Sequence, residues 1–245
     1  INLAKLDIRQ ESSRHSQLIS EFVKKKYNKD YVKLSEKEKI DFLKSKLNSK
    51  KNILNKFQFK NKENKEVWST FNLLSKEPSE CLGAYVISMT SSASDILSVS
   101  FLQKEAKIKN KLRVVPLFET LDDLINAKSI MENLFSHKWY RNLIKHKQEV
   151  MIGYSDSSKD AGKMCASWHQ YKAQEEIVKL GNKYKIDITF FHGRGGSAGR
   201  GGGPIQATLR SLPPYSVNGK IRITDQGEVI QQKYGYEPLA KYNLC

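Results

Sequence analysis

The sequence predicts an α/β protein whose parallel strands form part of a helix-rich (β/α)8 barrel of the TIM type. From residue 80 onward a short apolar strand, a polar or charged tip and an amphipathic helix recur along the chain, and this alternation favours a parallel sheet. Reactive residues follow several successive strands, and only a barrel brings all of those strand ends to one mouth. An open doubly wound sheet is the alternative, with its chemistry at a single switch point.

Six strands are expected, and they are short runs of mainly apolar residues bounded by polar ones. The first alternates roughly between apolar and polar side chains and ends just before Arg9. The fifth leads directly into a glycine-rich segment. The expected strands cover residues 3–8, 84–89, 113–118, 150–154, 186–191 and 221–224.

Helices are expected where apolar residues recur at helical spacing. Residues 17–27 carry such a stripe, and Ser35 with Glu38 forms a capping box ahead of the next helix. Residues 68–74 resume the helical pattern. Later helices have N-terminal signals at Ser94, at Thr120 with Asp123 in the box position, and at Asp160.

We expect residues 1–245 to form an internal segment of one larger barrel domain, since the chain begins at Ile1 without a methionine. Residues 1–16 hold the first strand and Arg9, residues 17–79 form a helical, Lys/Asn-rich insertion, and residues 80–245 form successive βα units. Within the insertion, the low-complexity stretch 48–65 is the best candidate for a mobile surface segment.

Composition excludes several classes of protein. No apolar run approaches the roughly 20 residues needed to span a bilayer, and three widely spaced cysteines support neither a disulfide framework nor a zinc site. A cytoplasmic protein is expected. The net charge of +16 would suit nucleic acid, but half of the excess lies in residues 1–80, where Lys alternates with Asn and Glu. A solvated surface explains that pattern better, so no nucleic-acid or membrane partner is expected.

Residues 190–204 hold seven of the 14 glycines together with His192, Arg194 and Arg200. Glycines let backbone N–H groups turn toward one anion, and arginines add permanently charged forks that suit phosphate or carboxylate. A Walker loop is excluded because Pro204 follows the last glycine, and a Rossmann fingerprint fits weakly. A disordered Arg-Gly tail is the alternative, but such tails do not follow a buried strand.

Glu119 and Asp156 each follow an apolar strand within a residue or two. In a barrel both would project into the same mouth, where two carboxylates suit one Mg²⁺. Either carboxylate alone could instead cap a helix or form a salt bridge.

The chain resembles phosphoenolpyruvate carboxylase in six blocks that occur in the order of that family. The match includes the FHGRGG loop, whereas residues 17–79 and the last residues match weakly. The family's chain is several times longer. The six blocks are residues 6–12, 84–89, 115–124, 150–162, 190–204 and 222–228.

The resemblance implies a Mg²⁺-dependent carboxy-lyase, with Mn²⁺ as an alternative ion. Bicarbonate attacks the phosphorus of phosphoenolpyruvate to give carboxyphosphate and an enolate. Carboxyphosphate breaks down to CO₂ and phosphate, and the enolate carbon attacks the CO₂. The oxaloacetate formed would supply the tricarboxylic acid cycle.

The resemblance also implies a role for each candidate residue. Glu119 and Asp156 match the family's metal ligands. Arg9 and Arg194 would grip the substrate phosphate, with Gly195 and Gly196 in the same substrate-binding loop, and Arg200 would assist catalysis. Lys159 and His192 would help to hold bicarbonate and phosphoenolpyruvate, although His192 could instead be a hydrogen-bonded core histidine.

Further implications are a homotetramer and inhibition by a dicarboxylate. The family's basic histidine lies upstream and further arginines lie downstream, so the isolated segment should be inactive. Gln206, Arg210 and Leu212 depart from the family's pattern just after the glycine loop. The rival hypothesis is a non-catalytic anion- or RNA-binding module that uses the Arg-Gly loop, and a pyruvate-phosphate ligase or a kinase is a weaker third.

Overall fold

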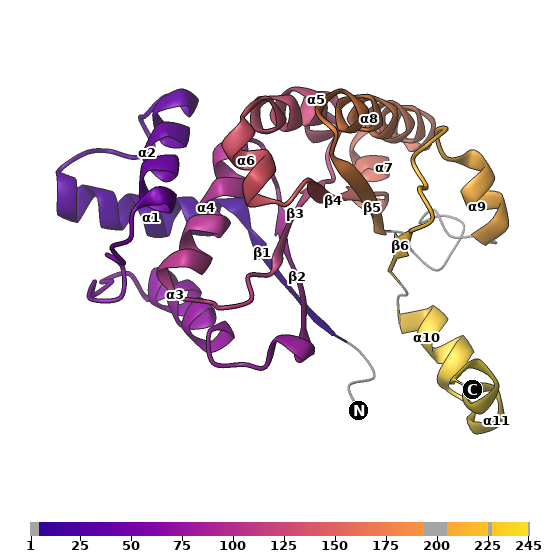
Figure 1. Ribbon diagram of the computed structural model, residues 1–245. Coiled ribbons are helices and arrows are strands. Elements are labelled where there is room, and N and C mark those ends of the chain that lie inside the picture. The colour runs from indigo at the N-terminus through magenta and orange to yellow at the C-terminus, as the bar shows by residue number, and fades with distance from the viewer. Residues whose placement is uncertain (1–4, 194–204, 225–226, 245) are drawn as a thin grey trace. The chain divides into compact units, whose positions relative to one another are not determined.

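The structure is a computed structural model that describes residues 5–193, 205–224 and 227–244 (Figure 1). It divides into two compact units, which are described separately. The first contains residues 1–117 and 129–144, and the second contains residues 118–128 and 145–245.

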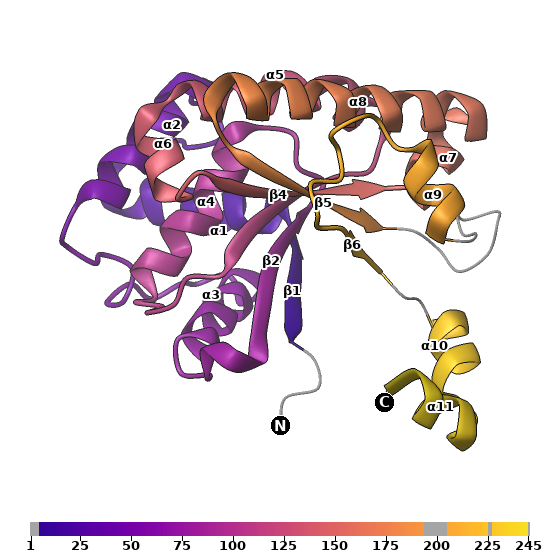
Figure 2. The same cartoon turned by 45° about the vertical axis from the view of Figure 1, so that its right-hand side comes forward.

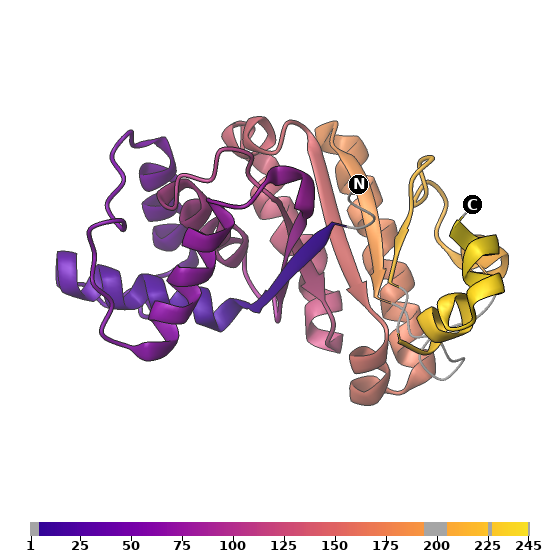
Figure 3. The ribbon, with the colours of Figure 1, turned by 90° about the horizontal axis from the view of Figure 1, so that it is seen from below.

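The first unit is built on parallel strands, β1 (Leu6–Glu11), β2 (Leu82–Ser88) and β3 (Arg113–Phe118). Strand β2 lies between the other two, and Val86 is in register with Arg9 of β1 and Val115 of β3. Figure 3 shows helices α1 to α4 gathered on one side of β1 and β2. The helices of this unit are α1 (Ser12–Tyr27), α2 (Glu36–Asn48), α3 (Lys62–Leu74), the 3-10 turn Ser79–Cys81, α4 (Ala93–Glu105), the second half of α5 (Leu121–Ser136) and α6 (Lys138–Leu143).

Capping boxes set the starts of two helices in this unit. Ser35 and Glu38 exchange hydrogen bonds at the start of α2, which confirms the predicted box. At α4 the N-cap is Ser92, two residues before the predicted Ser94, because Asp95 accepts from the backbone of Ser92 and sits in the box position. Ser94 instead donates two hydrogen bonds, from its backbone N–H and from its hydroxyl, to the carboxylate of Glu36 in α2.

Residues 48–65, which were expected to form a mobile surface segment, contact the core at several points, while their mobility stays a prediction. Leu54 and Phe59 are buried, and the Phe57 ring packs edge-on against Phe22 of α1. Glu105 of α4 accepts hydrogen bonds from the backbone of Ile53 and Leu54. The few apolar residues among the lysines and asparagines anchor the stretch to the core, and low complexity concealed them.

The second unit is built on β4 (Lys147–Gly153), β5 (Asp187–Gly193) and the short β6 (Arg222–Ile223), which pair in parallel in that order. Helix α8 (Lys163–Tyr184) runs alongside β4 and β5 (Figure 2). Its packing on the sheet is close at Gly181, where an added Cβ would lie 2.6 Å from Cγ1 of Ile188. The other helices are the first half of α5, α7 (Ser155–Ala161), α9 (Ile205–Ser211), α10 (Gly227–Tyr234) and α11 (Glu237–Leu244).

The α/β class with parallel strands is confirmed, with two further differences in the predicted elements. Strand β1 continues to Glu11, so Arg9 lies inside it and not after its end. Asp160 starts no helix: it lies within α7 and accepts a hydrogen bond from Leu121 N at 3.0 Å, so that it caps α5. The Thr120–Asp123 box is confirmed. In the described part of the chain no helix is long and apolar enough to cross a membrane.

Candidate active site

Two predicted residues lie near strand ends in the second unit, beginning with Glu119, the residue after β3. The backbone of Glu119 lies directly against Gly153, the last residue of β4: a Cβ built on Gly153 would come 2.6 Å from Glu119 Cβ and 2.9 Å from its Cα. Only glycine permits this approach. Glu119 is 6% exposed, and its backbone N–H donates to Asp123 at 3.2 Å. The main chain at Glu119 is therefore fixed by contacts on both sides.

Asp156 stands three residues after Gly153, in the first turn of α7. It is exposed, and its Oδ1 accepts a hydrogen bond from Nζ of Lys159 at 3.0 Å. Lys159 is one turn further along α7 and is also exposed. The structure thus brings two predicted site residues, Asp156 and Lys159, into direct contact. An exposed carboxylate with a flexible lysine partner can exchange that partner for a cation at little cost.

The turn from β4 into α7 is held by side chains that sequence analysis missed. Ser157 Oγ donates to the Gly153 carbonyl at 2.9 Å. Gln170 of α8 donates from Nε2 to Ser157 Oγ at 2.7 Å and to the same carbonyl at 3.2 Å. Gln170 and Gln174 are both buried, and their spacing of four residues on one helix face was the only signal in the sequence. These bonds fix the segment that carries Asp156.

A charged pair that the sequence did not indicate spans the ladder from β4 to β6. Arg222 Nη1 lies 2.7 Å from Glu149 Oε1, and the Arg222 guanidinium lies 4.2 Å from the centroid of the Phe191 ring. Glu149 is buried. Burial of a carboxylate requires such a partner. The pair therefore holds β6 against the first strand of its ladder across the intervening strand β5.

His192, the second-last residue of β5, has no exposed surface. Its Nδ1 shares a hydrogen bond of 2.9 Å with the hydroxyl of Tyr154. Its carbonyl accepts from the backbone N–H of Thr224 at 3.0 Å. This environment is the one expected of a core histidine, which was one of the two interpretations open from the sequence.

Arg9 belongs to the first unit. It is exposed on β1, in register with Val86 of β2. The remaining predicted residues, Arg194, Gly195, Gly196 and Arg200, lie outside the described residues.

The described residues contain no group of three or more His, Cys, Asp or Glu side chains that could hold an ion. Magnesium, however, is often bound by one or two carboxylates, with water and substrate oxygens completing its shell. Glu119 and Asp156 supply that donor set from one unit, on segments that meet at Gly153. Hard anionic oxygens suit Mg²⁺ and equally Mn²⁺.

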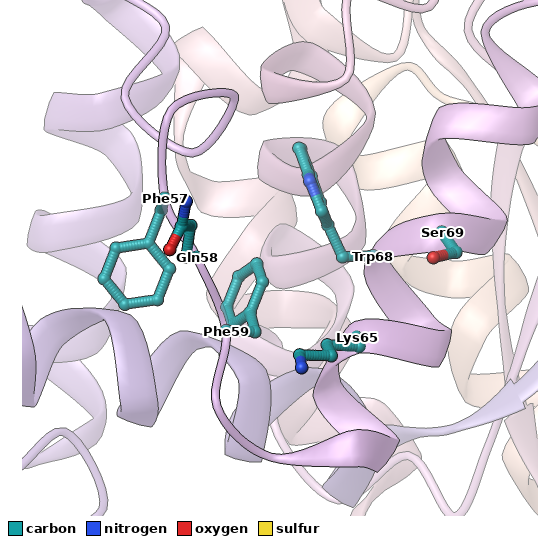
Figure 4. A pocket seen from close by; sticks show the side chains of 6 residues that line it. All are labelled: Phe57, Gln58, Phe59, Lys65, Trp68 and Ser69. Atoms are coloured by element: carbon teal, nitrogen blue, oxygen red, sulfur yellow. The ribbon is translucent and has the colours of Figure 1, made fainter.

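One pocket, of about 370 Å³, lies in the first unit and contains none of the predicted site residues. Figure 4 shows aromatic rings and the Lys65 side chain around it. Two of the rings, Phe59 and Trp68, are themselves buried. The lining residues are Phe57, Gln58, Phe59, Lys65, Trp68 and Ser69.

The fold and the site define a class of protein: an α/β protein with parallel strands and with charged residues near the strand ends. Comparison with known proteins narrows the class, because the profile described as "Phosphoenolpyruvate carboxylase" matches residues 1–245. The chain belongs to the phosphoenolpyruvate carboxylase family.

Individual relatives agree. The chain is 48% identical over 239 residues to phosphoenolpyruvate carboxylase of Flaveria pringlei, covering 98% of this chain and 25% of the relative. It is 49% identical to phosphoenolpyruvate carboxylase 3 of Arabidopsis thaliana, with coverage of 96% and 24%. It is also 49% identical to the enzyme of Acinetobacter baylyi, with coverage of 100% and 28%. The chain thus spans about a quarter of the length of these curated relatives.

Proposed function

We propose that this chain forms part of the (β/α)8 barrel of a phosphoenolpyruvate carboxylase, which converts phosphoenolpyruvate and bicarbonate to oxaloacetate and phosphate. The observation that carries the proposal is the juxtaposition at Gly153. A buried carboxylate that follows one strand, Glu119, is packed against the residue that begins the turn to a second carboxylate, Asp156. In a βα barrel these positions face the reaction site.

In this proposal Glu119 and Asp156 hold Mg²⁺, with Mn²⁺ as an alternative. When bound, the ion supplies positive charge to the phosphate and enolate oxygens as negative charge moves between them. Asp156 would bind the ion in place of Lys159, whose Nζ lies 3.0 Å from Asp156 Oδ1. The ammonium of Lys159 would then be available to a second anion, and bicarbonate is the anion that the reaction requires.

The arginines hold the phosphate. Arg9 and Arg194 bind its oxygens, and Gly195 and Gly196 let the backbone approach the same anion. Arg200 stabilises the charge that develops when the bicarbonate oxygen bonds to phosphorus and the bond from phosphorus to the enol oxygen breaks. Carboxyphosphate then releases CO₂ and phosphate, and the enolate carbon attacks the CO₂ to form oxaloacetate.

The whole enzyme is proposed to be a cytoplasmic homotetramer that a dicarboxylate inhibits and that supplies oxaloacetate to the tricarboxylic acid cycle. Residues 1–245 alone should not carboxylate, since the basic histidine and further arginines of the family lie outside them. The RNA-binding hypothesis receives no support from the relatives described above, all of which are named as carboxylases.

The proposal is tested with a full-length protein that contains this sequence. Isotopically labelled bicarbonate should enter oxaloacetate only when phosphoenolpyruvate and Mg²⁺ are present, with one phosphate released per carboxylation. Transfer of the phosphoryl group from phosphoenolpyruvate to a nucleotide, with no incorporation of bicarbonate, would instead indicate a ligase or a kinase. Tight binding of single-stranded RNA with a steep salt dependence, and no incorporation of label, would reject the enzyme.

A further inference from the structure

The alternation of side chains along β5 determines the sheet face on which His192 lies. His192 pairs with Ile152 of β4, and successive residues of a strand point to opposite faces of the sheet. Ile188, four residues earlier on β5, therefore lies on the same face as His192. Ile188 packs against Gly181 of α8. His192 thus points to the face that α8 covers.

A histidine in this place is poorly situated to touch a substrate. It has no exposed surface, and the addition of further protein around the chain can only cover it more. Its Nδ1 is also in a hydrogen bond with Tyr154 at 2.9 Å. Tyr154 is the N-cap of α7 and stands two residues before Asp156.

We propose that His192 serves the reaction as a positioning residue, through Tyr154. The bond joins the end of β5, just before Arg194, to the start of α7, which carries Asp156 and Lys159. It fixes the Tyr154 ring, and with it the first turn of α7. The inference rests on the proposed metal role of Asp156, and it reassigns His192 from substrate contact to the support of that carboxylate.

The test uses a double-mutant cycle in a full-length protein that contains this sequence. The variants are Tyr154→Phe, which removes one oxygen, His192→Leu, and the two together. The dissociation constant for Mn²⁺ is measured without substrate, by electron paramagnetic resonance of the free ion. If the bond positions Asp156, each single variant should weaken Mn²⁺ binding by about tenfold, the lower end of the range for groups that orient metal ligands. The double variant should be no weaker than the weaker single one.

A matched control exists in the first unit. His15 of α1 and Tyr85 of β2 form a second buried pair, with 2.8 Å between His15 Nε2 and the tyrosine hydroxyl. Tyr85→Phe removes the same atom from the same kind of bond. It should lower the melting temperature as Tyr154→Phe does and leave the Mn²⁺ dissociation constant unchanged. Equal weakening of Mn²⁺ binding by both variants would overturn the inference, since general destabilisation would then explain it.

Two other results would also overturn it. One is unchanged Mn²⁺ affinity in Tyr154→Phe, a result that decides the matter even if His192→Leu fails to fold. The other is a large loss of kcat/KM in the single variant His192→Leu, together with a double variant whose loss equals the sum of the two single losses. That result is expected if His192 touches the substrate. The variant Asp156→Asn distinguishes failure of the proposed metal site from failure of the positioning role. Unchanged Mn²⁺ binding in Asp156→Asn rejects the metal site itself. Weakened Mn²⁺ binding in Asp156→Asn, with unchanged binding in Tyr154→Phe, rejects only the positioning role of His192.

Discussion

Glu105 at the end of α4 accepts a hydrogen bond of 2.8 Å from the backbone N–H of Leu54, 51 residues away in sequence. The same carboxylate oxygen accepts from Ile53, and its other oxygen is 2.9 Å from Nζ of Lys104. Glu105 has no exposed surface. The Glu105 side chain thus holds the stretch of residues 48–65 against α4.

Glu105→Ala should destabilise the protein by about 2–4 kcal/mol, because two backbone donors lose their acceptor, at about 1–3 kcal/mol each where they stay buried. Glu105→Gln keeps an acceptor oxygen and should cost less. Urea unfolding of both variants measures the difference, and proteolysis should cut residues 48–61 faster in the alanine variant. Equal stability of wild type and Glu105→Ala would show that the stretch is not anchored by this residue.

Replacement of the metal carboxylates provides the most direct test of the proposed site. Glu119→Gln and Asp156→Asn each remove one charge at constant volume, and an amide oxygen is a poorer ligand for Mg²⁺. Half-saturation should therefore need at least about tenfold more Mg²⁺, with turnover reduced by orders of magnitude at ordinary metal concentration. Activity is measured against Mg²⁺ concentration, with thermal unfolding of the same samples. A lower melting temperature with an unaltered metal curve would make both carboxylates structural.

Gly153→Ala should perturb the same site without touching a charge. The added methyl group would meet Glu119 backbone and Cβ atoms at 2.9 and 2.6 Å, so the chain must shift, at a cost of about 1–3 kcal/mol for an overpacked core. The Mg²⁺ requirement should rise with that shift. Gly227→Ala is the control, because nothing lies within 4 Å of its added Cβ. A Gly153→Ala protein with wild-type metal dependence would contradict the close packing.

Stability should fall in mild acid because of His15. Burial lowers the pKa of His15 to about 3 from its ordinary 6.5, so the unfolded chain binds this proton at a higher pH than the folded one. Stability is therefore complete above pH 6.5 and decreases toward pH 3. Between neutrality and pH 5 the loss from this group is about 2 kcal/mol. Urea unfolding at pH 7 and pH 5 should give a smaller difference for His15→Gln than for wild type, and equal differences would refute the assignment.

The parts of the fold that the sequence predicted were those specified by local signals. The five strands after residue 80 were predicted within about three residues at each end, because a run of apolar residues between polar ones is a local pattern. The Ser35–Glu38 and Thr120–Asp123 boxes were predicted for the same reason. Asp160 was misassigned because it caps a helix that begins 39 residues earlier. Nothing in its local sequence distinguishes that role from capping the helix that follows.

In the candidate site, too, only the features specified by local signals could be predicted from the sequence. Glu119 and Asp156 were found from their places after strands, but the contact between Glu119 and Gly153 depends on how neighbouring chain segments pack. The partnership of Asp156 with Lys159 could have been expected from the spacing of three residues on a helix. Gln170 was missed because a buried glutamine looks like any polar helix residue until its partners are known. The same holds for Glu149 and Arg222, 73 residues apart.

The separation of 73 residues between Glu149 and Arg222 affects how the chain tolerates insertions and deletions. Strand β6 has only two residues, and side-chain contacts of Arg222 with Glu149 and the Phe191 ring help to hold it in place. The entropy lost on closing a loop grows only with the logarithm of its length, about 0.6 kcal/mol for each doubling. A change in the length of the chain between residues 205 and 221 should therefore alter the entropy of loop closure only slightly, so the integrity of the sheet places little limit on the length of this segment.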